Sequence, residues 1–301
     1  MGRIAFICSL VALIAGAAAG SPAAARVGPE IAYSTQTEVF LVNRDGSGKV
    51  RLYRSKSNNF ISSVALKPGG GTIAFVEDWT LKFLDYNSAG QPVGTVRTIL
   101  PSCYRLTDVH YHPDGNSVSY REVCGENGVV KRVTVPATSS DAPVPVTLLT
   151  QASFLDLGPW DPSGNSFVYS YYTDTQVEVR RHYIDGTPNP AEPIATASGS
   201  TQIRYPDVSN SGTKMLVSDT PLAAGCCPGP GYTSELDAFS GAVLRSNFIT
   251  GRKARYSPDD SRIVFIFYKS YNERYLQYLD VDGQLKRIGG KGIYWSVDWG
   301  N

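Results

Sequence analysis

The sequence contains few charged residues, and the two signs nearly cancel. Only 18% of its 301 residues are Asp, Glu, Lys or Arg, compared with about a quarter in ordinary soluble proteins. The formal net charge at pH 7 is +1. A near-neutral chain lacks the basic excess that draws nucleic acid or an anionic membrane over long distances. We therefore expect neither of these as a partner.

Helical patterning is also missing. After residue 26, no segment places apolar residues at helical spacing between credible caps. Hydrophobic residues nevertheless make up 42% of the chain, and 18 Tyr, 11 Phe and 4 Trp provide bulky side chains for a core. Gly (29) and Pro (19) together exceed their usual share. These proportions exclude a disordered chain, a collagen and a coiled coil.

Motifs for common cofactors and reactions are absent as well. The segment around Gly46 has the Gly-Lys of a phosphate-binding loop, but Asn43 and Val50 stand where Gly and Ser or Thr are needed. It also begins like a calcium loop, yet Arg54 occupies the twelfth position, where Glu is required. No G-x-S-x-G nucleophile elbow exists. We expect no cofactor, and the sequence favours a protein that is not an enzyme.

Residues 1–25 are typical of a secretory signal peptide. Arg3 precedes an apolar or small stretch over residues 4–20, and an Ala-rich site ends at Ala25, with Ala19 as a second candidate for cleavage. The alternative is a retained membrane anchor, because the apolar run approaches the length of a span. We expect cleavage, which leaves residues 26–301 as a single exported domain without a membrane span, secreted or in the periplasm or cell envelope.

From residue 26 onward, the sequence repeats a strand, a tight turn and a second strand five times. The turn positions are separated by 45, 49, 48 and 48 residues: Pro68, Pro113, Pro162, Asn210 and Pro258. Pro presets the φ of such a turn, and a following Gly accepts the positive φ. Short strands bounded by turn residues at a fixed period indicate a β-repeat architecture.

A second turn recurs in these units and contains an aspartate. It follows a strand at each of five positions: Asp45, Asp85, Asp185, Asp237 and Asp280. Each unit therefore contains four antiparallel strands, named A to D in chain order, with the first turn joining A to B and the Asp turn joining C to D. Four strands in a repeat of this length predict a propeller blade.

The two ends of the chain complement each other. Residues 293–301 match strand A up to its turn, whereas residues 31–54 match strands B, C and D without a preceding A. Pairing them removes the open sheet edge that would otherwise invite aggregation. The sequence thus predicts an all-β fold, a six-bladed β-propeller of four-stranded antiparallel blades, whose ring is closed by a composite blade from both termini.

The repeat resembles that of TolB-like β-propellers, a PDG-repeat family that is similar to WD-repeat propellers. The resemblance rests on the PDG-type turn, a following strand such as Ile-Ala-Phe-Val at residues 73–76, and the later D-x-x-G turn. It covers nearly all of residues 26–301, although Asn210 and Asp260 replace Pro and Gly in two copies. TolB itself has a further N-terminal α/β domain that we do not find here. The resemblance implies a platform that binds a protein or a small ligand.

Strand A is the strand nearest the central channel, so its polar side chains are candidates for ligand binding. The charged residues and the histidine that stand three and five positions before the turns are Asp108, His110, Asp207, Lys253, Arg255 and Asp298. The alternative is that they only hydrogen-bond to neighbouring blades and channel water. A glycan lyase or hydrolase acting at the channel, with Asp108, His110 or Asp207 as acid or base, is the alternative function.

Two further columns of the repeat have simpler interpretations. We expect the residues two before each turn to pack between blades: Leu66, Tyr111, Trp160, Val208, Tyr256 and Trp299. His110 and His112 point to one face of their strand, as zinc ligands can. A zinc site needs a third protein ligand, and the sequence has only one other histidine, His182. We expect no metal site.

Four cysteines remain after signal cleavage, an even number that favours disulfides in an exported chain. Cys103 and Cys124 flank one predicted hairpin at spacings that permit a bridge. Cys226 and Cys227 lie together in the longest B–C connection, where a vicinal bridge, free thiols and pairing with the first two cysteines all remain open.

In a propeller, D–A and B–C connections emerge on one face and A–B and C–D turns on the other. The four cysteines therefore belong to the first face, together with five aromatic residues: Trp79, Tyr171, Tyr172, Tyr268 and Tyr271. Aromatics on braced loops are typical anchors for peptides or sugars, although they can also merely cap strand ends. We expect a monomer whose partner is an envelope or extracellular protein, a peptide or a glycan.

Overall fold

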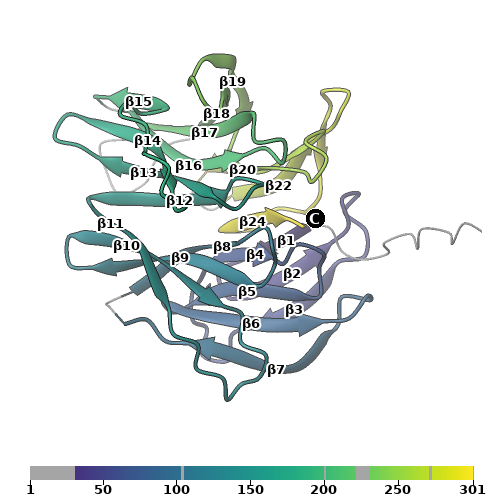
Figure 1. The fold of residues 1–301 in the computed structure, drawn as a ribbon. Helices are drawn as coiled ribbons and strands as arrows, with labels where there is room; N and C mark the ends of the chain where they lie inside the picture. The colour runs from purple at the N-terminus through teal and green to yellow at the C-terminus, as the bar shows by residue number, and fades with distance from the viewer. Residues whose placement is uncertain (1–30, 103–104, 200, 222–230, 271–272, 301) are drawn as a thin grey trace, which may run out of the picture.

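The computed structural model describes residues 31–102, 105–199, 201–221, 231–270 and 273–300. In these residues, 24 strands form six four-stranded antiparallel sheets around one axis (Figure 1). The inner strand of each sheet contacts the inner strands of its two neighbours, which closes the ring. The predicted all-β, six-bladed propeller is confirmed.

Five blades are continuous in sequence, and in each the strands run from the channel outward in chain order. The first two are β4 (Ile61–Leu66), β5 (Thr72–Glu77), β6 (Thr80–Tyr86) and β7 (Pro92–Ile99), then β8 (Arg105–Tyr111), β9 (Ser117–Cys124), β10 (Asn127–Thr134) and β11 (Val146–Ala152). The other three are β12 (Phe154–Trp160), β13 (Ser166–Tyr172), β14 (Gln176–Tyr183) and β15 (Ala195–Ser198), then β16 (Thr201–Val208), β17 (Lys214–Pro221), β18 (Tyr232–Asp237) and β19 (Val243–Thr250), then β20 (Arg252–Tyr256), β21 (Ile263–Ser270), β22 (Glu273–Leu279) and β23 (Leu285–Arg287).

The sixth blade combines the two ends of the described chain. Its strands, from the inside outward, are β24 (Ser296–Trp299), β1 (Ile31–Ser34), β2 (Glu38–Val42) and β3 (Val50–Arg54). Ile31 lies opposite Trp299, and Ser34 lies opposite Ser296. The predicted composite blade is therefore confirmed.

The A–B turns have the expected chemistry. In the first, the backbone N–H of Lys67 donates to the Thr72 carbonyl oxygen at 3.0 Å, and that of Gly70 donates to Lys67 at 2.8 Å. Gly70 has a φ of +80°, which glycine adopts without strain. Corresponding backbone bonds close the other four turns.

The two copies that depart from the turn consensus compensate for each other. The backbone N–H of Asn210 donates to Asp260 Oδ1 at 2.6 Å, and that of Ser211 donates to Oδ2 at 2.7 Å. The Asn210 side chain also donates to the Ser257 carbonyl oxygen at 2.9 Å. A proline at position 210 has no N–H to donate, so the two departures together bind neighbouring blades.

The core lies between the blades, where the apolar faces of adjacent sheets meet. The six residues two before each turn are all buried: Leu66, Tyr111, Trp160, Val208, Tyr256 and Trp299. Their predicted packing role is confirmed. Among the described residues, no helix is long and apolar enough to span a membrane.

Three inner strands contain a left-handed residue at the same place, five positions before the turn. Asp108, Tyr205 and Lys253 have φ values of +46°, +53° and +53°. The strand pairing shifts register at each of these sites. A bulge of this kind changes the direction of the side chains around it. The bulges therefore affect which inner-strand side chains share one part of the channel.

Candidate functional site

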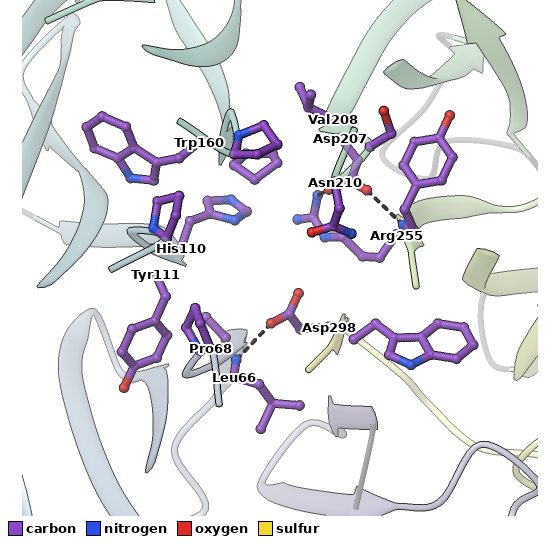
Figure 2. A pocket seen from close by; sticks show the side chains of 17 residues that line it. Leu66, Pro68, His110, Tyr111, Trp160, Asp207, Val208, Asn210, Arg255 and Asp298 are labelled. Atoms are coloured by element: carbon purple, nitrogen blue, oxygen red, sulfur yellow. Dashed lines mark hydrogen bonds and ion pairs between the residues drawn. The ribbon is translucent and has the colours of Figure 1, made fainter. Parts of the chain in front are cut away.

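A cavity of about 230 Å³ lies at the A–B turn end of the channel. Its rim includes the turn prolines Pro68, Pro113 and Pro162, and we name it the proline-ring pocket. Four of the six channel residues singled out in the sequence line it: His110, Asp207, Arg255 and Asp298. Figure 2 shows His110, Arg255 and Asp298 extending from three different strands toward the same central space.

Asp207 and Arg255 form an ion pair on one side of this pocket. Arg255 Nη1 donates to Asp207 Oδ1 at 2.9 Å, and the backbone N–H of Tyr256 donates to Oδ2 at 2.9 Å. Burial raises the pKa of Asp207 above its ordinary value, although Arg255 opposes the shift. Both oxygens of this carboxylate are therefore already engaged.

Asp298 projects from β24 on another side of the pocket. The backbone N–H of Leu66 in the next blade donates to Asp298 Oδ2 at 2.7 Å. The backbone N–H of Trp299 also acts on this carboxyl and, like that of Leu66, lowers its pKa. Burial raises the pKa of Asp298 to about 6, against the opposing effect of Arg255.

His110 is neutral, and its tautomer follows from one contact. Nε2 lies 2.9 Å from the carbonyl oxygen of Leu157, which can only accept, so Nε2 carries the hydrogen. Burial, reinforced by Arg255, holds the pKa of His110 well below its ordinary value. Nδ1 is thus an unprotonated acceptor, and it has no partner among the described residues. His110 itself is 7% exposed.

The other two predicted channel residues, Asp108 and Lys253, lie away from this pocket, five positions before their turns. They belong to a group that we name the loop-end cluster, because it lies toward the D–A and B–C connections. Four of its members are on inner strands and Arg121 is on the adjacent strand β9: Asp108, Arg121, Asp156, Arg204 and Lys253. Arg204 binds Asp156 through two hydrogen bonds of 2.8 Å. Arg121 Nη1 lies 3.7 Å from Asp108 Oδ2.

The two carboxyl groups of the loop-end cluster have pKa values that their surroundings shift in opposite directions. Burial raises the pKa of Asp108, although Arg121 opposes it. Burial also acts on Asp156, but the Arg204 guanidinium outweighs it and holds the pKa of Asp156 below its ordinary value. Burial lowers the pKa of Lys253 to about 8, with Asp108 opposing the shift. The cluster therefore contains a lysine whose pKa of about 8 lies near neutral pH, beside two carboxyl groups whose pKa values are shifted in opposite directions.

The predicted partner face is less uniform than the sequence suggests. The Tyr171 hydroxyl donates to Glu178 at 2.9 Å. The guanidinium carbons of Arg252 and Arg274 lie 5.1 and 4.7 Å from the centre of the Tyr268 ring. Tyr172 is half-buried. Tyr271 lies outside the described residues, so its predicted place on this face stays a prediction.

Trp79 is the most exposed of the four described aromatics, with 37% of its surface accessible. It lies in the two-residue B–C connection between β5 and β6, in which Asp78 and Trp79 have φ values of +46° and +64°. The guanidinium carbon of Arg105 lies 5.2 Å from the centre of a Trp79 ring. Leu100, in the adjacent D–A connection, is 74% exposed.

The predicted disulfides involve cysteines outside the described residues, whereas the described residues can be searched for a metal site. Cys103, Cys226 and Cys227 lie outside the described residues, so the Cys103–Cys124 bridge and the vicinal bridge stay predictions. In the part of the chain that the structure describes, no group of three or more His, Cys, Asp or Glu residues is placed to hold a metal ion. His112 instead reaches the carbonyl oxygen of Gly164 at 3.1 Å.

Sequence comparison finds no matching protein-family model and no matching curated protein. The structure, in contrast, is similar to solved propellers. TolB from Acinetobacter baumannii superposes with a TM-score of 0.70 at 15% identity, over 92% of this chain and 68% of that chain. A chain of a nidogen/laminin complex gives 0.64 at 8% identity, over 90% and 97%.

An enzyme also has this fold. The periplasmic gluconolactonase PpgL of Pseudomonas aeruginosa superposes with a TM-score of 0.51 at 12% identity, over 90% of this chain and 98% of that chain. The chain thus has a TolB-like six-bladed propeller fold, as the repeat predicts. Identities this low establish the fold alone, because one fold supports many functions.

Proposed function

We propose that the protein is an exported binding propeller that recognises a partner protein through the loops at the D–A and B–C face. The observation that supports this most is the backbone conformation of Trp79. A two-residue turn with positive φ at both positions prefers Asn-Gly. A bulky side chain in the left-handed region costs about 1–2 kcal/mol. Such strain is concentrated at functional positions.

The surroundings of Trp79 suit protein recognition. Trp and Arg are the residues that most often dominate binding energy at interfaces. Arg105 stacks on the Trp79 ring and restricts it, so less conformational freedom is lost on binding. Leu100, the residue after the Ile99 that pairs with Leu81, adds an exposed apolar side chain near this turn. We name this group, Trp79, Arg105 and Leu100, the tryptophan patch.

Trp79→Gly separates recognition from folding. Because glycine adopts positive φ freely, we expect the variant to be as stable as the native protein or up to about 1 kcal/mol more stable. Its affinity for a partner isolated from an envelope extract should fall by about two orders of magnitude or more, as for an interface hot spot. Urea unfolding and titration with the purified partner measure the two quantities.

A matched control is Leu285→Ala, which removes an even more exposed apolar side chain (62% accessible) from the outer strand β23. It should leave the affinity unchanged. If Trp79→Gly binds the partner as tightly as the native protein does, the tryptophan patch is not the recognition site.

Export belongs to the same proposal. We infer that residues 1–25 are removed as a signal peptide and that the protein functions outside the cytoplasm, where Cys103 and Cys124 pair in a disulfide. The gluconolactonase with the same fold is a periplasmic protein by its description. Mass spectrometry of the exported protein, before and after reduction, tests both points: the chain should begin at Arg26.

A second candidate function is hydrolysis or elimination on a glycan at the loop-end cluster. It is favoured by Asp108 and Asp156, whose pKa values are shifted in opposite directions. Environments that shift the pKa values of two carboxyl groups in opposite directions are typical of acid–base pairs. Because one protein of this fold is described as a gluconolactonase, sugar lactones belong in the substrate panel beside glycans.

Asp108→Asn tests this alternative. If Asp108 is a general acid or base, the variant should lose about 100-fold or more of any turnover on the panel, while its affinity for the protein partner is retained. If the native protein turns over none of these substrates but binds the partner through Trp79, the enzymatic alternative is excluded and only the binding proposal is supported.

A further inference from the structure

We propose that the proline-ring pocket binds a primary alkylammonium group, with Oδ1 of Asp298 and Nδ1 of His110 as hydrogen-bond acceptors. This would be a second site, at the opposite end of the channel from the tryptophan patch. It does not depend on the proposed protein partner.

Charge is the first argument. The pocket contains two carboxylates, Asp207 and Asp298, and one guanidinium, Arg255, while His110 is neutral. Arg255 is hydrogen-bonded to Asp207. With both carboxylates ionised, the pocket has a net charge of about −1, which attracts a cation and repels an anion in a partly buried site.

Hydrogen-bonding capacity narrows the class of cation. Asp298 Oδ2 is occupied by the N–H of Leu66, which leaves Oδ1, and His110 offers only the lone pair of Nδ1. Among the described residues no side chain donates to Oδ1 and no group donates to Nδ1, and His110 is more than nine-tenths buried. A primary ammonium group brings three N–H donors on one compact charge. A quaternary ammonium group would satisfy the charge but neither acceptor.

The walls of the pocket suit an alkyl chain. Pro68, Pro113, Pro159 and Pro162 line it, and proline has a rigid apolar ring and no backbone N–H. A short hydrocarbon chain can contact these rings without leaving a backbone donor unsatisfied. The cavity of about 230 Å³ has room for an alkylammonium of a few carbon atoms.

Two sources carry this group: a free alkylamine and the lysine side chain of a peptide. Calorimetric titration of the purified protein with n-butylammonium and with Nα-acetyl-lysine methylamide distinguishes them. We expect n-butylammonium to bind at millimolar concentrations or below, and roughly tenfold more tightly than tetramethylammonium, since charged hydrogen bonds contribute this much. Binding of the lysine derivative alone would assign the site to a peptide.

Asp298→Asn is the decisive variant, because its amide oxygen can still accept from Leu66. It should weaken n-butylammonium binding by roughly tenfold or more while the circular dichroism spectrum stays unchanged. Asp185→Asn, in the C–D turn of the third blade and outside the pocket, is the matched control and should bind like the native protein.

Protonation of Asp298 gives an independent readout. Arg255, Asp207 and His110 face it across the pocket, and its pKa is about 6. Binding to the native protein should weaken by about tenfold for each pH unit below this value, and Asp298→Asn should abolish this dependence. Equal binding of tetramethylammonium, an unaffected Asp298→Asn variant, or no binding of either amine at millimolar concentration would each overturn the proposal.

Discussion

Replacing Trp299 with alanine is expected to lower the free energy of unfolding by about 3–5 kcal/mol. Its side chain is 8% exposed and packs in the cluster that joins the composite blade to the fifth blade, with its ring 6.2 Å from that of Tyr278. Its backbone also pairs with Ile31. A loss of this size is a large part of the roughly 5–15 kcal/mol that stabilises an ordinary domain.

Urea unfolding followed by circular dichroism measures this loss. The control is Trp79→Ala, which truncates the same residue type at an exposed turn and should change stability by about 0.5 kcal/mol or less. A Trp299→Ala variant that unfolds at the native urea concentration would show that β24 contributes little to the ring. The composite blade would then not be the closure that stabilises the fold.

Asp298→Asn is expected to make the protein more stable at pH 8, by about 2 kcal/mol. Burial raises the pKa of this carboxyl from 3.8 to about 6. Between these two values the native state holds a proton that the unfolded chain has released. The free energy of unfolding therefore falls as the pH rises through this window, and a side chain that cannot ionise avoids the loss.

The test is to measure the free energy of unfolding of the native protein and of Asp298→Asn as a function of pH. Their free energies of unfolding should agree near pH 4 and diverge up to about pH 7, with the variant the more stable. Asp85→Asn is the opposing control, because Arg97 outweighs burial and holds the pKa of Asp85 low. That variant should be less stable than the native protein at neutral pH, by a margin that shrinks in acid. A destabilised Asp298→Asn variant at pH 8 would contradict the argument.

The architecture was predictable because it depends on local turn chemistry repeated at a fixed period. Pro68 and its equivalents mark the A–B turns, and the packing column ending in Trp299 follows from them by counting. The composite blade also follows, since only a strand A could complete the segment that begins at Ile31. None of these inferences needs a long-range contact to be known in advance.

The channel could be predicted only in part, because strand A is not regular. The left-handed bulges at Asp108, Tyr205 and Lys253 shift the pairing, and no glycine marks them in the sequence. Counting residues placed six titratable side chains in one channel, whereas the structure separates four in the proline-ring pocket from two in the loop-end cluster. Asp156 and Arg204, which form the strongest pair of that cluster, fell outside the counted columns.

Two other features depend on partners distant in sequence. Asn210 and Asp260 read as degenerate copies of the repeat, and only the folded ring shows that each supplies what the other needs. Trp79 was singled out for its aromatic side chain, but its positive φ follows from the tight connection between β5 and β6. Backbone strain of this kind has no signature in residue type.

The pairing of β1 with β24 has a mechanical consequence. The two strands are antiparallel, and the chain enters at Ile31 beside the point where it leaves at Trp299. A tether pulling these two points apart would load the hydrogen bonds between the strands one after another, as a zipper is opened, and not all together in shear. The ring would therefore yield to modest tension applied at its own seam.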